Sequence, residues 1–500
     1  MYYSLVNEKL YPDLNPIIYH PTLHAIYPKQ WQDQLTDIIW YVLFAVVETH
    51  RAIQTSSFAY NAIHDALPRD ADHHLQLNRE VYGYKSRAFR LLNEELQRPD
   101  RQLNDMTLTC VLTLLLAETQ LAAVGGWHAH FQGANKIIQV RGGLAAVFRQ
   151  IPYWRNDLLK YFMLADICGA ATEANLLLSD AERQLEYRPL IEEFFDNGSG
   201  TCVPFPDELL NAMIQVNYLR AASSSNRLVE GGDQDAITDN DTGTLKSSVR
   251  DVLERILSFS ASQWSTRMAN KCPKTIEFVS KVSIKPGFIR PTRDDWLCIA
   301  SVYHAAVLLY CIRSLALDFD ELFCFPCPVP GEVGEFGANG GSGEMLSYVT
   351  IQDIQVVARQ TLTDEIRAIF SLACSRPSSN SQSRHRPSQP LGKIVVWPLF
   401  VAGVEAAVDV SSFYPPSRYS SWSRNEALDL VCNAMRKLSK DIGTLNLLDA
   451  VAFLTREWES NCQRWWLAGQ LRHEIELPGE KRWWNEIVAS LQGGGGVFFM

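Results

Sequence analysis

Four residues in one part of the chain have the side chains of a zinc site. Cys324 and Cys327 form a C-x2-C pair, and His304 and Cys311 precede it. Thiolate and imidazole groups are the ligands of tetrahedral zinc centres. However, no second C-x2-C pair and no H-x3-5-H pair follows at zinc-finger spacing, and the periodicity around His304 and Cys311 places both inside one helix. We therefore expect no metal site here. Redox use of the pair is not expected either, because no thioredoxin-like strand–helix pattern surrounds it.

A second candidate is the acidic segment at 318–321, which reads D-F-D-E. It resembles the aspartate-rich, magnesium-binding segment of terpene synthases, whose acidic side chains clamp Mg²⁺ on a diphosphate. That chemistry also needs an N-x3-S-x3-E motif downstream, and none follows Glu321. We interpret Asp318, Asp320 and Glu321 as a solvated helix end. No G-x4-G-K-S/T, G-x-S-x-G or H-E-x2-H string occurs, so the sequence predicts no catalytic residues and no enzyme.

Two histidines lie in the most distinctive string of the chain, W-x2-H-x2-G-A-x6-R-G-G, which begins at Trp127. His128 and His130 could bind a ligand or transfer a proton. The string supplies no other reacting group, so we interpret His130 as a structural histidine, hydrogen-bonded inside a helix pair. Two tryptophan pairs occur near the end of the chain, Trp465-Trp466 and Trp483-Trp484. They could stack on a planar ligand or a partner, but we expect them to fill a terminal helix interface.

The same string predicts a packed helix. Its apolar residues recur at i, i+4, i+7 and i+11 and form one face: Trp127, Phe131, Ala134 and Ile138. Gly133 lies in the middle of the helix, where glycine costs about 1 kcal/mol relative to alanine, so we interpret it as a notch for a closely packed helix. Arg141, Gly142 and Gly143 predict a left-handed C-terminal cap, with the arginine favourable near the last carbonyls.

Helical periodicity dominates the rest of the chain, and alternating strand patterns are rare and short. The clearest helical segments are 84–95, 108–116, 296–312 and 427–438. Asn104 or Asp105 is expected to cap the second of these, and Asp294 or Asp295 the third. The sequence therefore predicts an all-α fold, a large multi-helix, solenoid-like bundle.

Composition narrows the class of protein further. The 500 residues are 47% hydrophobic and 20% charged, with a net charge of −10, which makes direct binding to duplex DNA unfavourable. The 11 cysteines are irregularly spaced, as is typical of reduced, buried thiols in an intracellular protein. No signal peptide pattern is present, and the longest apolar stretch, 108–124, is too short to span a bilayer. No membrane association is expected.

Three stretches interrupt the helical pattern and are expected to be disordered surface insertions: 223–248, 328–343 and 375–390. The third is locally basic. It could serve in nuclear import or contact an anion, but we favour a solvated loop. None of the three is a convincing domain linker, because the helical segments beside each are incomplete alone.

The string at 127–143 resembles a known family signature. It is similar to the fungal-specific transcription factor domain, the regulatory domain found downstream of binuclear zinc-cluster modules in fungal regulators. A second match is WPLFVAGVEA at 397–406, where the family often carries a W-P-L-F-x-A-G-x-E-like helix. Pro398 suits the first helical turn, and Gly403 allows close packing. A third, weaker match is a helix pair at 427–458. The resemblance covers roughly residues 30–470.

The resemblance implies three parts: an N-terminal extension at 1–30, the regulatory domain at 31–470, and a C-terminal segment with a frayed tail at 471–500. Zinc-cluster regulators usually also carry six cysteines in two C-x2-C-x6-C-like halves. No such pattern occurs, and the first cysteine is Cys110. We expect the chain to start at the regulatory domain, with the DNA-reading module absent, lost or on a neighbouring reading frame.

The implied function is that of a nuclear transcription regulator, controlling a metabolic or secondary-metabolite pathway. Protein partners are expected, either a second copy or a related transcription factor, and a small-molecule effector could bind. No cofactor is expected, DNA-binding residues are unknown, and DNA would be reached only indirectly or through the missing zinc-cluster module. The alternatives are a helical interaction scaffold in a nuclear assembly, an inhibitory partner of a full-length regulator and, less favoured, an α-helical enzyme.

Overall fold

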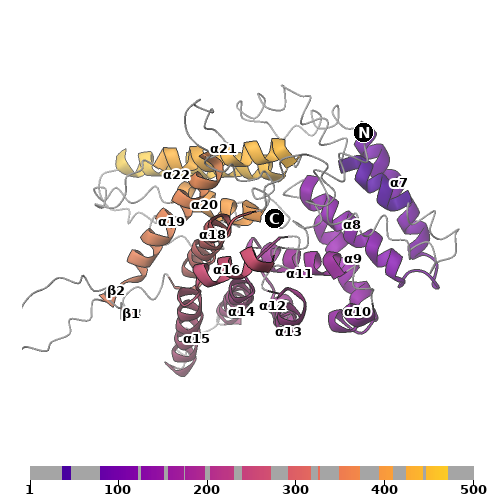
Figure 1. The fold of residues 1–500 in the computed structure, drawn as a ribbon, viewed down its shortest axis with the longest axis horizontal. Coiled ribbons are helices and arrows are strands. Elements are labelled where there is room, and N and C mark those ends of the chain that lie inside the picture. The colour runs from indigo at the N-terminus through magenta and orange to yellow at the C-terminus, as the bar shows by residue number, and fades with distance from the viewer. Residues whose placement is uncertain are drawn as a thin grey trace, which may run out of the picture.

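The described part of the chain is helical except for one short antiparallel strand pair (Figure 1). In that pair, β1 (Phe325–Pro326) lies beside β2 (Tyr348–Val349). The prediction of an all-α fold is confirmed. The computed structural model describes these residues: 37–46, 79–121, 126–150, 156–173, 175–196, 203–229, 239–271, 291–316, 325–326, 348–371, 394–408, 424–442 and 446–470.

The helices of the first half follow one another at short intervals. A helix at 37–46 comes first. The elements after it are α7 (Arg79–Leu96), α8 (Asp105–Leu121), α9 (Trp127–Val140), α10 (Leu144–Gln150), α11 (Asn156–Ala171), α12 (Leu178–Leu185) and α13 (Arg188–Phe194).

The second half has longer helices. Its elements are α14 (Asp207–Val229), α15 (Asp239–Leu257), α16 (Ala261–Lys271), α18 (Arg293–Cys311), the π-helical turn η4 (Ile312–Ala316), α19 (Ile351–Ser371), α20 (Val396–Val408), α21 (Arg424–Ile442) and α22 (Asn446–Gln470).

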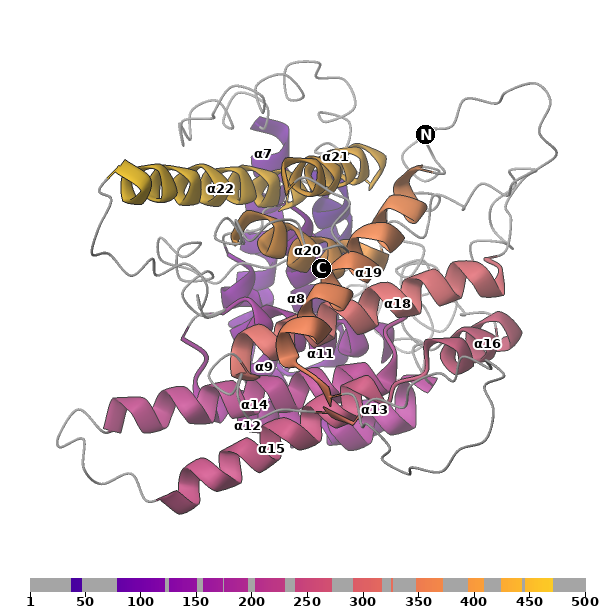
Figure 2. The same cartoon turned by 90° about the vertical axis from the view of Figure 1, so that its left-hand side faces the viewer.

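α18 lies at the centre of the second half of the described chain. Figure 1 places α7 to α10 at one end of the molecule and α19, α21 and α22 towards the other. In Figure 2, α21 and α22 lie side by side along one side, α14 and α15 lie along the opposite side, and α18 and α20 lie between. α18 packs against α14, α15, α16, α19 and α20. One hydrophobic core runs through both halves of the described chain.

Burial accounts for the apolar composition of α18. Among the described residues, Arg293–Leu315 is the one helix long and apolar enough to cross a membrane, and 72% of its most apolar window is covered by the rest of the protein. Its largest side chains, Trp296, Tyr303 and Tyr310, are at most 1% exposed. A helix that is apolar on all sides fits a position at the centre of a large bundle.

α8 is also enclosed on nearly every side, more completely than its pattern predicts. The predicted apolar face, which includes Leu108 and Leu115, is buried. The threonines of the opposite face are buried too. Thr109 and Thr113 donate to the carbonyls four residues earlier, at 2.7 and 2.8 Å. Because these hydroxyls are satisfied within their own helix, they can enter the core at little cost.

Two helix starts test the predicted caps. The backbone N–H of Thr107 donates to Asn104 Oδ1 at 2.7 Å, so the predicted Asn104 cap of α8 is confirmed. At α18 the prediction is wrong, because Thr292 is the N-cap. Its side chain accepts from the Asp295 N–H, and Asp295 Oδ2 accepts from the Thr292 N–H at 2.7 Å. This reciprocal capping box uses Asp295 three residues inside the helix rather than at its start.

The expected insertion at 223–248 is wrong over most of its length. α14 continues to Val229 and α15 begins at Asp239, so only 230–238 separate them. Ser223 donates to the Leu219 carbonyl at 2.8 Å, and α15 buries Val249 and Val252 against the core. Packing between α14 and α15 outweighs the low helix propensity of this polar sequence. The expected insertions 328–343 and 375–390 lie outside the described residues, as do 1–30 and 471–500.

Candidate functional site

The predicted face of the signature helix α9 is buried as expected. Trp127, Phe131, Ala134 and Ile138 are at most 7% exposed. The Phe131 ring stacks on Phe162 of α11, with centroids 4.6 Å apart. These contacts fix α9 against α11, so the bulky residues of the signature act as packing residues.

The two histidines of the signature stack on aromatic rings. His130 lies parallel to Phe89 of α7, with centroids 5.5 Å apart, and His128 lies over Trp127 at 3.8 Å. Burial lowers the pKa of both imidazoles, which keeps them neutral at neutral pH. His130 therefore occupies a structural place between α7 and α9, held by ring stacking rather than by the hydrogen bond we predicted.

The predicted left-handed cap closes α9. Gly142 and Gly143 have φ angles of +96° and +90°. The Gly143 N–H donates to the Ile138 carbonyl and the Gly142 N–H to the Gln139 carbonyl, which is the Schellman arrangement. Arg141 then pairs, at 2.8 Å, with Asp105, the first residue of α8. The R-G-G end of the signature thus both stops α9 and ties it to α8.

The close-packing role belongs to Gly403 and not to Gly133. A Cβ at Gly133 would meet only Val111 Cγ1, at an ordinary 3.9 Å, so the predicted notch there is wrong. A Cβ at Gly403 would overlap Leu454 Cδ1 of α22. Leu454 is fully buried, so moving its side chain would disturb the packed core around it. The second motif therefore holds the real helix–helix notch, between α20 and α22.

Other residues of the second motif extend into the core. Pro398 is the third residue of α20, in the first turn, as predicted. The Trp397 ring is 2% exposed and meets Tyr310 of α18 edge-on, with centroids 6.1 Å apart. Phe400 is fully buried. α20 is thereby fixed to α18 on one side and to α22 on the other.

Glu405 of the same motif is the centre of a buried charge triad with Arg313 and Arg359. Arg313, from η4, donates to its two oxygens at 2.7 and 3.1 Å, and Arg359, from α19, donates at 2.6 Å. The side chains of Glu405 and Arg313 are 4% and 3% exposed. Burial alone would raise the pKa of Glu405, but the two guanidinium groups outweigh it and lower the pKa to about 2.

Sequence reasoning missed the triad, although one signal was present. Glu405 is the single charged residue of the otherwise apolar helix α20. A carboxylate in such a helix is buried only when it is paired. What the pattern could not supply was the partners, which come from 92 and 46 residues away.

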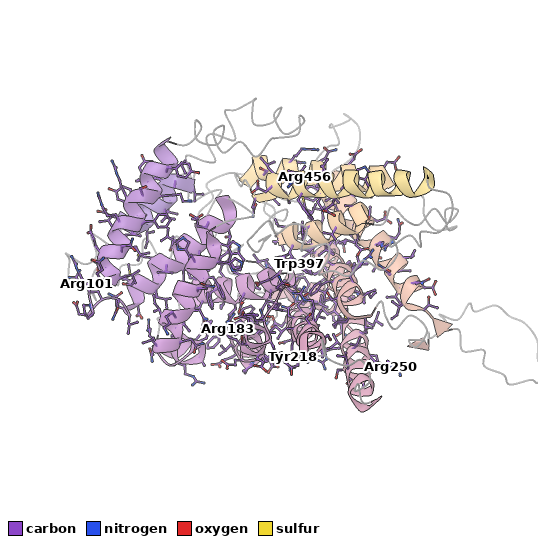
Figure 3. All side chains as sticks on the ribbon, turned by 180° about the vertical axis from the view of Figure 1, so that it is seen from behind. Arg101, Arg183, Tyr218, Arg250, Trp397 and Arg456 are labelled. Carbon is purple, nitrogen blue, oxygen red and sulfur yellow. The ribbon has the colours of Figure 1, made fainter. Side chains whose placement is uncertain are left out.

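A second set of polar side chains, buried except for the half-buried Arg183, links α11, α12, the residue before α13, α14 and α18, and we call it the polar network. Its members are Asp166, Arg183, Gln184, Tyr187, Asn217 and Tyr310. Arg183, the half-buried member of the network, and Trp397 of α20 are labelled in Figure 3.

At one end of the polar network, three groups converge on α11. Arg183 Nη2 donates to both Asp166 oxygens, at 3.1 and 3.2 Å, and Tyr187 OH donates to Oδ2 at 2.6 Å. Burial and the neighbouring carboxylate raise the pKa of Tyr187, so its phenol stays protonated and remains a donor. Gln184 Nε2 donates to the Asp166 backbone carbonyl at 3.0 Å.

At the other end, Asn217 of α14 joins three helices. Its amide nitrogen donates to the Ile167 carbonyl of α11 at 3.1 Å and to Gln184 Oε1 of α12 at 2.9 Å. Its amide oxygen accepts from Tyr310 OH of α18 at 2.6 Å. Both donors and the acceptor are used, so this fully buried amide is satisfied.

The remaining predicted candidates do not form a reactive centre in the described residues. His304 bonds the Ile256 carbonyl at 2.9 Å, and Cys311 is fully buried. Cys324, Cys327 and 318–321 lie outside the described residues, as does the second tryptophan pair. Trp465 and Trp466 belong to α22, and their side chains are not described. No cluster of three His, Cys, Asp or Glu side chains suited to a metal occurs in the described segments.

One small apolar cavity lies beside the second motif, between α11, α18 and the start of α20. Its lining includes Cys168, Phe205, Tyr303 and Trp397. Burial raises the pKa of Cys168 to about 12, which leaves a neutral thiol there. Such a lining offers no convergent charged groups for catalysis.

Comparison with known proteins identifies the family of the chain. The chain matches the fungal specific transcription factor domain over residues 27–466, a span that contains both α9 and α20. It is also similar to the phomenoic acid biosynthesis cluster-specific transcriptional regulator of Leptosphaeria maculans, with 22% identity over 470 residues, which are 92% of this chain and 70% of that protein. No solved structure matches the chain. The resemblance predicted from the two motifs is therefore confirmed, and the chain belongs to the fungal specific transcription factor domain family, a family of transcription regulators and not of enzymes.

Proposed function

We propose that the chain is the regulatory part of a nuclear regulator that controls one secondary-metabolite gene cluster. The likeness to a cluster-specific transcriptional regulator over 92% of the chain carries this proposal. Membership of a transcription factor family supports the nuclear location. The architecture is consistent with the role, because its motifs build a packed scaffold.

Deletion of the gene in its own fungus, followed by transcript sequencing, tests the proposal. We expect coordinated change in a contiguous set of biosynthetic genes and little change elsewhere. Re-expression of the wild-type chain should restore those transcripts, and so should Arg267→Met, which removes an exposed arginine paired with Glu208 at 3.0 Å. Transcript changes scattered across the genome, with no common cluster, would show that the chain is not cluster-specific.

We further propose that the chain reaches promoters through a zinc-cluster module that does not lie within these 500 residues, carried by a second regulator or by a longer product. The net charge of −10 and the missing six-cysteine pattern support this route. Chromatin immunoprecipitation of the tagged chain should recover cluster promoters, and mass spectrometry of the same material should recover a six-cysteine sequence. Recovery of promoters with no such sequence present would contradict the route.

The inhibitory alternative makes an opposite prediction in the same strain. If the chain sequesters a full-length relative, overexpression should lower cluster transcripts and deletion should raise them. If the chain contributes to activation, overexpression should raise cluster transcripts and deletion should lower them. A scaffold in an unrelated nuclear assembly would leave cluster transcripts unchanged in both strains.

A further inference from the structure

The polar network lies between the two family motifs. At its first end, the Arg183 guanidinium lies over the Phe131 ring of α9, with the Cζ atom 5.5 Å from the centroid. At its last end, the Tyr310 ring meets the Trp397 indole of α20 edge-on. Arg183 is connected to Tyr310 through Asp166, Gln184 and Asn217: the Asp166 carboxylate accepts from Arg183, and the Asp166 backbone carbonyl accepts from Gln184. The two motifs, about 270 residues apart in sequence, are thus joined by one continuous set of contacts.

Each group in this set constrains the next one. Because the Ile167 carbonyl can only accept, the Asn217 nitrogen must face it, which leaves Oδ1 to accept from Tyr310. Gln184 must then present its oxygen to the Asn217 nitrogen and its own nitrogen to the Asp166 carbonyl. Reversing either amide would set acceptor against acceptor or donor against donor. In a buried setting such bonds polarise and fix one another, so the loss of one changes the strength of the others.

We propose that the polar network couples the two halves of the domain energetically, so that the arrangement around α11 to α13 sets the strength of the contacts made by α18 and α20. The network is suited to this because five of its six members are buried, Arg183 being half-buried, and they come from α11, α12, the residue before α13, α14 and α18, in both halves. The proposal concerns the domain itself and does not depend on which genes the regulator controls.

A double-mutant cycle of two hydroxyl deletions tests the coupling. Tyr187→Phe removes the bond to Asp166, and Tyr310→Phe removes the bond to Asn217, and neither opens a cavity. The two tyrosines share no contact with each other in the network. We expect each variant to lower the folded-to-unfolded ratio in urea about fivefold. In the double variant, the decrease of the folded-to-unfolded ratio should be smaller than the product of the two single decreases by about threefold or more.

Tyr161 gives the matched control. It is a buried tyrosine of α11, in the same half as Tyr187, and its hydroxyl bonds Thr119 Oγ1 at 2.6 Å, outside the polar network. Tyr161→Phe combined with Tyr310→Phe should be additive. The proposal is overturned if Tyr187→Phe and Tyr310→Phe are additive as well, or if the control pair shows the same shortfall.

Discussion

Neutralising Glu405 should destabilise the domain more than any surface substitution. In Glu405→Gln the amide keeps the size of the side chain but removes the charge that balances Arg313. Arg313 is 3% exposed, so water cannot replace the lost carboxylate. Breaking a buried ion pair from one side typically costs about 3–5 kcal/mol. Arg359, with 25% of its side chain exposed, adds less because solvent screens it.

The assay is urea unfolding of the purified chain, followed by tryptophan fluorescence and circular dichroism. Glu208→Gln is the matched control, because Glu208 pairs with Arg267 at 3.0 Å while both side chains are more than 40% exposed. Its free energy of unfolding should change by less than about 1 kcal/mol. We expect the Glu405→Gln midpoint to lie well below that of the control.

A compensating variant separates charge imbalance from lost packing. Arg313→Met together with Glu405→Leu removes both buried charges and keeps much of the side-chain volume. It should recover most of the stability that Glu405→Gln loses, because apolar replacement of a buried ion pair is often neutral or better. The reasoning is refuted if Glu405→Gln costs no more than the Glu208 control, or if the double variant is less stable than Glu405→Gln.

Three further outcomes follow from the same contacts. Gly403→Ala should lower the free energy of unfolding in urea by about 1–3 kcal/mol, because the added methyl overlaps Leu454. Gly133→Ala should be neutral or stabilise α9 by up to about 1 kcal/mol. Equal effects of the two substitutions would contradict the assignment of the close-packing role to Gly403. Gly142→Ala should cost about 1–2 kcal/mol, measured as a lower melting temperature, because φ is +96°, and an unchanged temperature would show that the cap is dispensable. Folding lowers the pKa of Glu405 from 4.5 to about 2, so ionised Glu405 stabilises the folded state by about 3 kcal/mol above pH 4.5, and this contribution disappears as the pH falls towards 2. Between these pH values the free energy of unfolding should fall more steeply for the wild type than for Glu405→Gln. Parallel slopes would contradict this prediction.

Local signals in the sequence were reliable where they depend on neighbours in the chain. The spacing of Trp127, Phe131 and Ala134 defines one helical face, and the Arg141-Gly142-Gly143 string fixes a left-handed cap, because glycine alone adopts such φ values freely. The Asn104 cap follows the same logic, since its partner lies three residues away. These features involve contacts within one or two helical turns, which composition and spacing describe directly.

Apart from the cap of α18, where Thr292 and not Asp294 or Asp295 is the N-cap, errors arose where a distant helix decides the outcome. Ser-rich residues after 223 have low helix propensity, yet they lie in α14, which packs against α15. Gly133 and Gly403 are equivalent in the sequence pattern, but only Gly403 faces a side chain that leaves no room for a Cβ. Propensity and periodicity carry no information on which surface approaches from elsewhere in the chain.

The helical class, the turns that end the signature helix, and the family could all be read from the amino-acid order, because each depends on short-range spacing or on motif order. The pairing of Glu405 with Arg313 and Arg359, and the position of Asn217 between α11, α12 and α18, emerged with the folded arrangement of the helices. A buried charge or amide must find its partner wherever the fold brings one, and its sequence position does not specify that partner.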